Sequence, residues 1–283
     1  MTPETDRIQH VSDTALLVAA CRALETGREY GFVSDPFAEK LAGARGMALA
    51  HNNSTIGLMC VGIGMRSRFL DEVLLKTLAG GEITTVLSLG AGLDARPYRL
   101  DLPAGLHWIE VDFEDMLDYK SAVLAGDRPR CRLERLAADL NDPAGRAAIF
   151  RATGERPALM ITEGLLMYLP GGTIEALAAE AARTSIRRWI LDLTSLPLAQ
   201  QLHRDSSWDD IKAVRAEDHL DGGAILDTVA RNGWAPSERR TYVVDGRPIV
   251  AARFKAMGIT PPAGQDKMFP EDDPSGVHLF ARA

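Results

Sequence analysis

From residue 83 onward, short apolar runs alternate with helix-forming stretches, and this alternation restricts the fold more than any other feature. The runs expected to form strands are 84–89, 106–111, 132–138, 158–162 and 189–193, followed by 239–244 and 278–282. Helices are expected at 115–124, 173–184 and 225–232. Strand–helix alternation of this kind predicts an α/β fold, with a mostly parallel sheet covered by helices on both faces.

Residues 1–80 differ from this core because they contain helical patterns and no clear strand. Helices are expected over 14–24, 37–42 and 64–78, whereas 48–63 is expected to be a short helix or a mobile segment. The proline-containing stretch 258–276 is expected to be an irregular loop. We therefore expect a single domain over 1–283, in which a helical cap and lead-in over 1–80 precedes an α/β core over 81–283.

Composition excludes several classes of protein. Apolar residues make up 46% of the 283 residues and the net charge is −7, which gives no global attraction to nucleic acid or to an anionic membrane. No apolar run approaches the ~20 residues of a membrane span, and residues 1–9 lack the apolar stretch of a secretory signal. Cys21, Cys60 and Cys131 are odd in number and lie far apart in sequence, which argues against a disulfide framework and against a clustered zinc site. We expect a cytoplasmic protein without metal, nucleic-acid or membrane partners, and leave its oligomeric state open.

Glycine or acidic residues follow four of the expected strands. Gly90-Ala91-Gly92 follows the first, and Asp112, Asp139-Leu140 and Glu163 follow the next three. Ligands of open parallel sheets bind beyond this carboxyl edge, where glycine lets the backbone approach them closely. Asp112 comes about 20 residues after Gly90, the spacing at which a carboxylate binds ribose hydroxyls. Each feature alone is commoner as a turn or a helix cap, but together they predict a site for an adenosine-containing cofactor.

Two cofactors fit this pattern to different degrees. Residues 90–95 match the G-x-G-x-x-A fingerprint of dinucleotide sites. Asp94 opposes a dinucleotide because its carboxylate would lie where the pyrophosphate charge belongs, and Pro97 and Pro103 interrupt the helix that should follow. S-adenosylmethionine instead carries a sulfonium and an ammonium, which tolerate carboxylates, and one carboxylate. Arg66 or Arg68 can pair with that carboxylate, although a solvated helix surface explains these arginines about as well.

The segment 86–100, VLSLGAGLDARPYRL, resembles the leucine carboxyl methyltransferase family. Further similar segments are VSDTA at 11–15, WIEVD at 108–112, ADL at 138–140 and TEGLLMYL at 162–169. Position 95 is alanine where the family pattern has threonine. The resemblance covers most of the chain, and it is strongest to the bacterial branch that acts on small molecules, a group similar to polyketide carboxyl methyltransferases.

This resemblance implies a Rossmann-like class I methyltransferase fold, a seven-stranded, mostly parallel sheet with a helical N-terminal cap. It implies S-adenosyl-L-methionine as the cofactor, with Arg66 on its carboxylate and with Gly90, followed by Ala91 and Gly92, beside its methionine part. It places Asp112 on the ribose hydroxyls.

The resemblance also assigns the remaining site residues. Asp139 and Leu140 would frame the adenine, Glu163 would lie near the ammonium group, and Tyr168 would lie close to the substrate.

The expected activity is O-methylation of a small molecule, with the carboxylate of a natural product as the leading acceptor. A carboxylate is ionised at neutral pH and needs no general base, whereas a phenol with a pKa near ~10 would benefit from one. His10, His51, His203 and His219 form no recognisable arrangement with an orienting group, so no catalytic residue is predicted. The alternatives are an NAD(P)-dependent oxidoreductase of Rossmann type, a non-enzymatic S-adenosylmethionine-binding protein and a methyltransferase that acts on a protein.

Overall fold

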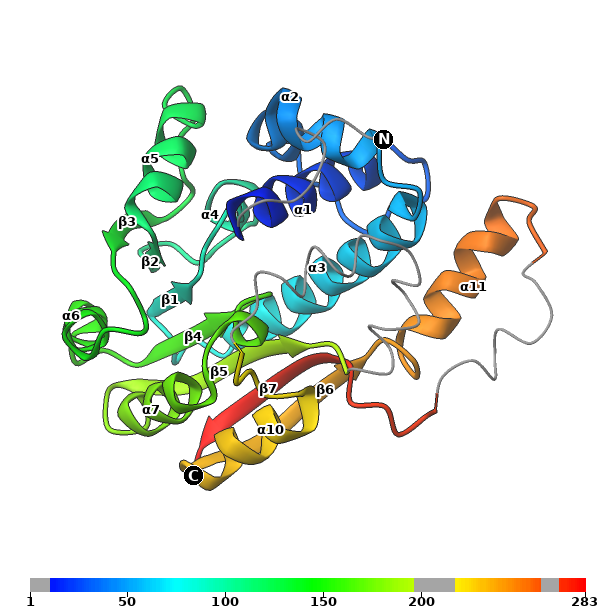
Figure 1. Ribbon diagram of the computed structural model, residues 1–283. Coiled ribbons are helices and arrows are strands. Elements are labelled where there is room, and N and C mark those ends of the chain that lie inside the picture. Colours follow the sequence, from blue (N-terminus) through cyan, green and yellow to red (C-terminus); the bar gives the residue numbers. More distant parts are fainter. Residues whose placement is uncertain (1–10, 196–216, 261–269) are drawn as a thin grey trace.

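The computed structural model describes residues 11–195, 217–260 and 270–283, and a seven-stranded sheet lies at its centre (Figure 1). The strands are β1 (Thr85–Leu89), β2 (His107–Asp112), β3 (Arg132–Ala137), β4 (Ala158–Thr162), β5 (Ile186–Leu193), β6 (Trp234–Thr241) and β7 (Gly276–Arg282). Their order is β3-β2-β1-β4-β5-β7-β6, with β1 to β5 parallel and β7 antiparallel to both of its neighbours. The predicted sheet is therefore confirmed. Its strand order reverses beside β1, the position at which open sheets of this kind bind ligands.

The helices match the sequence predictions in part. They are α1 (Val11–Thr26), α2 (Ala38–His51), α3 (Ile56–Ala79), α4 (Arg96–Arg99), α5 (Glu114–Val123), α6 (Pro143–Thr153), α7 (Gly171–Ala181), α10 (Gly222–Arg231) and α11 (Gly246–Ala256), with a short 3-10 helix at Leu166–Tyr168. Residues 48–63 are mostly helical, because α2 runs to 51 and α3 begins at 56, which corrects the expected short or mobile segment. The sequence analysis missed α6 and α11 and placed β6 about five residues too late.

Alternating strand residues pack on opposite faces of the sheet. Leu87, Met160 and Trp189 join the core formed with α6, α7 and α10, whereas Val86 and Ile190 join the core formed with α3. Both faces are therefore apolar, as expected for a sheet that is covered on each side. None of the helices among the described residues is long and apolar enough to cross a membrane.

The N-terminal helices lie over the carboxyl edge of the sheet (Figure 1). Residues of α1 and α2 form a third apolar cluster with Leu93 and Tyr98, which follow β1. Arg22 of α1 is 6% exposed, and it donates hydrogen bonds to Asp35 (2.9 Å) and to the carbonyl of Leu93 (2.6 Å). These contacts fix α1 as a cover above the loop that follows β1.

Candidate functional site

A cavity of about 310 Å³ opens between the carboxyl ends of β1 to β4 and the covering helix α1. All nine residues that the sequence analysis placed in the site line it: Arg66, Gly90, Ala91, Gly92, Asp112, Asp139, Leu140, Glu163 and Tyr168. Thr14, Ala15, Val18 and Arg22 of α1 line its other side. Its volume is at the lower end of the ~300–1,000 Å³ of small-molecule sites.

Arg68, the other arginine considered for the cofactor carboxylate, does not line this cavity. Its side chain is 41% exposed, and its Nε donates to Oε1 of Glu72 at 2.8 Å, one helical turn away. Residues two positions apart point to different sides of a helix, so Arg66 and Arg68 cannot both face the sheet. The structure therefore leaves Arg66 as the arginine of the pair that faces the site.

The glycine loop after β1 takes a backbone shape that only glycine adopts easily. Gly90 has φ +60°, and a Cβ atom there would lie 2.8 Å from Cδ1 of Leu165. Gly92 has φ +42°, and its N–H donates to Oδ2 of Asp112 at 2.7 Å. The loop is thus tied to the end of β2, and it leaves a bare backbone facing the cavity.

Asp112 accepts a second hydrogen bond, at Oδ1, from the N–H of Phe113 (2.8 Å). Burial raises the pKa of Asp112, and these two backbone donors only partly oppose it. Each carboxylate oxygen keeps acceptor capacity beyond its one backbone bond. Asp112 can therefore accept hydrogen bonds from two neighbouring hydroxyl groups of a ligand.

Phe113 also lines the cavity and is 58% exposed, which is unusual for a large apolar side chain. The sequence analysis missed it, although the signal was an aromatic residue directly after the acidic end of a strand. Leu140 also lines the cavity and is buried, and Asp139 beside it accepts at Oδ1 from the N–H of Asn141 (2.8 Å). Phe113 and Leu140 give this end of the cavity an apolar lining.

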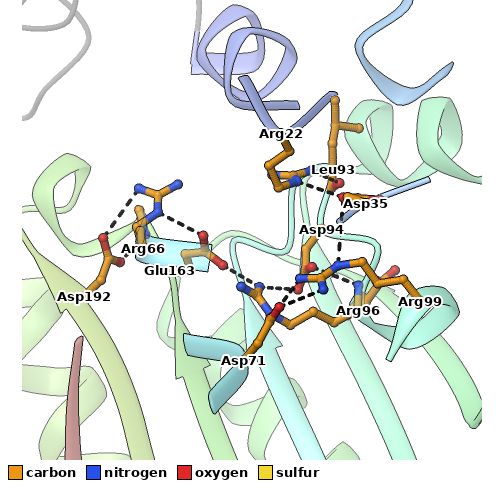
Figure 2. Close-up of polar contacts among 12 residues, drawn as sticks. Arg22, Asp35, Arg66, Asp71, Leu93, Asp94, Arg96, Arg99, Glu163 and Asp192 are labelled. Atoms are coloured by element: carbon orange, nitrogen blue, oxygen red, sulfur yellow. Dashed lines mark hydrogen bonds and ion pairs between the residues drawn. The ribbon is translucent and has the colours of Figure 1, made fainter. Parts of the chain in front are cut away.

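The other end of the cavity is charged, as Figure 2 shows. Nε of Arg66 donates to Oε1 of Glu163 at 2.9 Å, and Nη1 of Arg96 donates to Oε2 of the same carboxylate at 2.5 Å. Burial acts to raise the pKa of Glu163, but the guanidinium groups of Arg96 and Arg66 outweigh it, so this pKa lies below its ordinary value. Glu163 is therefore ionised at neutral pH.

Arg96 connects Glu163 to further carboxylates beneath the cavity. It is 1% exposed, and it pairs with Asp71 at 2.6 Å and with Asp94 at 2.9 Å; Arg99 pairs with Asp71 at 2.7 Å. Burial opposes ionisation of Asp94, but the surrounding cations, Arg96 first, lower its pKa. Asp94 lines the cavity, so the loop after β1 presents a carboxylate where a pyrophosphate would need donors, and α4 beyond it has only four residues.

Asp192, at the end of β5, is a site residue that the sequence analysis missed. Its Oδ1 accepts from the N–H of Gly164 at 2.5 Å, and its Oδ2 lies 3.5 Å from Nη1 of Arg66. Burial is the main cause that raises the pKa of Asp192. Asp192 and His219 line a second cavity of about 70 Å³, and Arg66 lines both cavities. The signal was available, because Asp192 is an acidic residue one position before the carboxyl end of a strand.

The remaining histidines of interest lie elsewhere. His51 is exposed at the end of α2, and His10 and His203 are outside the described residues. His107 lies 3.0 Å from Glu134 on the neighbouring strand, far from either cavity lining.

Comparisons with protein families and with individual proteins agree on the family of this chain. The model of the leucine carboxyl methyltransferase family matches residues 15–182. A relative from Streptomyces avermitilis is 37% identical over 202 residues, which cover 65% of this chain and 70% of the relative. A relative from Saccharopolyspora erythraea is 32% identical over 249 residues, 81% of this chain and 85% of the relative. Both carry the name of an S-adenosyl-L-methionine-dependent methyltransferase.

The fold is shared with a solved structure. The crystal structure of a DUF574 family protein from Streptomyces avermitilis superimposes with a TM-score of 0.54 at 14% identity, and the match covers 93% of this chain and 96% of that one. At this identity the likeness concerns the fold alone.

Proposed function

We propose, from the premise that this chain belongs to the leucine carboxyl methyltransferase family, that it methylates an oxygen atom of a small molecule, in the first place a carboxylate. The chain is an S-adenosylmethionine-dependent methyltransferase with the Rossmann-like class I fold. The acceptor and the roles of the individual site residues are the proposed part.

The observation that carries the proposal is the pair of opposite charges at one end of the large cavity. Arg66 and Glu163 both line it, and they lie side by side. The amino-acid end of S-adenosylmethionine has one carboxylate and one ammonium group. We assign the carboxylate to Arg66 and the ammonium group to Glu163, which stays ionised and so keeps the charge that this contact needs.

The opposite end of the cavity suits the nucleoside. Asp112 would accept hydrogen bonds from both ribose hydroxyls while the N–H groups of Gly92 and Phe113 hold its carboxylate in place. The exposed ring of Phe113 and the side chain of Leu140 would cover the adenine, and Asp139 would lie at its edge. The glycine loop lets the backbone pass close to the part between ribose and amino acid.

When bound, S-adenosylmethionine supplies an electrophilic methyl group at its sulfonium. The contribution of this chain is to position that group and the acceptor oxygen, and to exclude water from them. Helix α1 covers the cavity through Thr14, Ala15 and Val18, and Tyr168 also lines it. A carboxylate acceptor arrives ionised, so no residue of the chain has to remove a proton.

The test uses S-adenosylmethionine labelled in its methyl group and pairs of acceptors with the same skeleton, such as a benzoic acid and the matching phenol. We expect label in a product that dilute alkali hydrolyses, because methyl esters are cleaved and methyl ethers are not. Alkali-stable label would make the acceptor a hydroxyl group, and label in added protein would indicate a protein acceptor. Cofactor binding without transfer to any acceptor would favour a non-enzymatic binding protein.

A further inference from the structure

Tyr242 follows β6 directly and lies beside the charged end of the site. Arg240 and Asp192 are both paired with Val277, from opposite sides of β7, so the ends of β6 and β5 are at the same level. The ring of Tyr242 stacks on Phe69, with centroids 6.2 Å apart and planes 12° from parallel. Phe69 lies three residues after Arg66 on α3, and therefore on the same face of that helix.

The hydroxyl group of Tyr242 is buried, and no hydrogen-bond partner for it exists in the described part of the chain. Burial and the charges of Asp192 and Glu163 raise its pKa well above the ordinary value, so the group is a neutral hydroxyl that keeps its proton. A buried donor without a partner destabilises a fold, and its presence next to a binding site suggests that a partner becomes available in another state.

The contacts of Arg66 indicate which group could become the partner of the Tyr242 hydroxyl. Its bond to Glu163 is 2.9 Å, but its contact with Asp192 is 3.5 Å, at the limit of a hydrogen bond. A ligand carboxylate bound to Arg66 would replace this weaker contact more easily than the bond to Glu163. Among the described residues, Asp192 would then keep only backbone donors, the N–H of Gly164 and its own N–H, and its buried charge would need a further donor.

We propose that Tyr242 is a positioning residue, whose hydroxyl donates to Asp192 when Arg66 turns from Asp192 to the carboxylate of the cofactor. Tyr242 would thus favour the cofactor-bound arrangement of Arg66 without contacting the cofactor. The inference rests on the proposed placement of the cofactor carboxylate at Arg66.

The test compares S-adenosylhomocysteine with 5′-methylthioadenosine, which has the nucleoside but no amino-acid part, by calorimetric titration. We expect Tyr242→Phe to raise the Kd of S-adenosylhomocysteine about tenfold, the loss of one hydrogen bond to a charged group, and to leave the Kd of 5′-methylthioadenosine unchanged. The midpoint of thermal unfolding without ligand should stay the same or rise, because the variant removes an unpartnered buried group.

Tyr98→Phe is the matched control. The hydroxyl of Tyr98 accepts a hydrogen bond from Arg135 (2.9 Å) and does not line either cavity, so its loss should lower the unfolding midpoint and leave both Kd values unchanged. Asp192→Ala adds a second check, since Tyr242→Phe should have no further effect on S-adenosylhomocysteine in that background.

Three results would overturn the inference: an unchanged Kd in Tyr242→Phe, an equal loss for both ligands, or the same tenfold loss in the Asp192→Ala background. Failure of the proposed function looks different. Wild-type protein would then not bind S-adenosylhomocysteine, or Arg66→Ala would bind it as well as wild type does, and the inference would fall with its premise.

Discussion

The two halves of the sheet build the site in different ways. At the ends of β2 and β3, the site carboxylates are held by donors that are close in sequence: Asp112 and Gly92 are 20 residues apart, and Asp139 and Asn141 are two residues apart. In the half formed by β5, β7 and β6, contacts are long-range, and Arg66 and Asp192 are 126 residues apart. The first half, formed by β1 to β4, is built from repeated parallel strand–helix units, so the place of a residue in the sequence indicates its place at the carboxyl edge of the sheet. In the second half, that place depends on β7, which is inserted antiparallel between β5 and β6.

The difference also concerns charge. The nucleoside end has two carboxylates, Asp112 and Asp139, each held by backbone N–H groups, while the amino-acid end belongs to an extended cluster of arginines and carboxylates (Figure 2). Removal of one charge should therefore affect binding alone at the first end, but folding as well at the second.

The largest effect, on the free energy of unfolding, is expected when the charged cluster around Arg96 is disrupted. Arg96→Met removes the cation shared by Asp71, Asp94 and Glu163, and it should lower the free energy of unfolding by about 3–5 kcal/mol, since buried carboxylates lose their partner. Urea denaturation measures this change. Arg68→Met is the control, because Arg68 is exposed and forms a surface ion pair with Glu72; it should change stability by less than about 1 kcal/mol. Equal effects of the two variants would contradict the structural role of the cluster.

The next largest effect is expected on ligand affinity at the nucleoside end, where a substitution should weaken binding without affecting folding. Asp112→Ala removes a charged acceptor worth about 1.5–3 kcal/mol for each ribose hydroxyl, so the Kd of S-adenosylhomocysteine should rise about a hundredfold or more. The Kd of 5′-methylthioadenosine should rise equally, because it has the same ribose. Asp115→Ala, an exposed residue of α5 outside the cavity, should bind both ligands as wild type does. Unchanged affinity in Asp112→Ala would show that this carboxylate does not bind the ribose.

A smaller and selective effect is expected at the amino-acid end. Arg66→Ala should raise the Kd of S-adenosylhomocysteine by about tenfold or more, because a charge-assisted hydrogen bond is lost, and leave that of 5′-methylthioadenosine nearly unchanged. Titration of both ligands gives the ratio directly. Equal losses for the two ligands would mean that Arg66 supports the structure of the cavity and does not bind the carboxylate.

The smallest effect is a pH dependence that differs between the ends. Asp112 has a raised pKa, so its charge is lost at a higher pH than that of an ordinary aspartate, and the affinity for 5′-methylthioadenosine should fall as the pH drops through that value. Glu163 has a lowered pKa and stays charged over this range. Asp112→Asn should remove this dependence. A profile in that variant parallel to wild type would assign the titration to another group.

The raised pKa of Asp112 should affect stability and ligand affinity in opposite directions. The folded chain binds this proton more tightly than the unfolded chain does, so the contribution of Asp112 to stability falls as the pH rises from the unfolded to the folded pKa. Affinity and stability should therefore change in opposite directions within that window.

The sequence predicted the regular half well. The short runs at 84–89, 106–111, 132–138, 158–162 and 189–193 predicted β1 to β5, although β5 begins at Ile186, and residues at the strand ends predicted the glycine loop, Asp112, Asp139 and Glu163. Asp192 was overlooked although it lies one position before the end of β5. Tyr242 could not be predicted, because only the insertion of β7 between β5 and β6 brings it to that end of the sheet. The interruption after the glycine loop was predicted from Pro97 and Pro103, and α4 has only four residues, but α11 lacks a comparable local signal.

The most direct test of the central claim is a calorimetric titration of wild-type protein with S-adenosylhomocysteine, with NADH titrated in parallel. We predict micromolar binding of S-adenosylhomocysteine and no binding of NADH, because Asp94 presents a carboxylate where a pyrophosphate would lie. Binding of NADH alone would make the loop after β1 a dinucleotide site and would contradict the account.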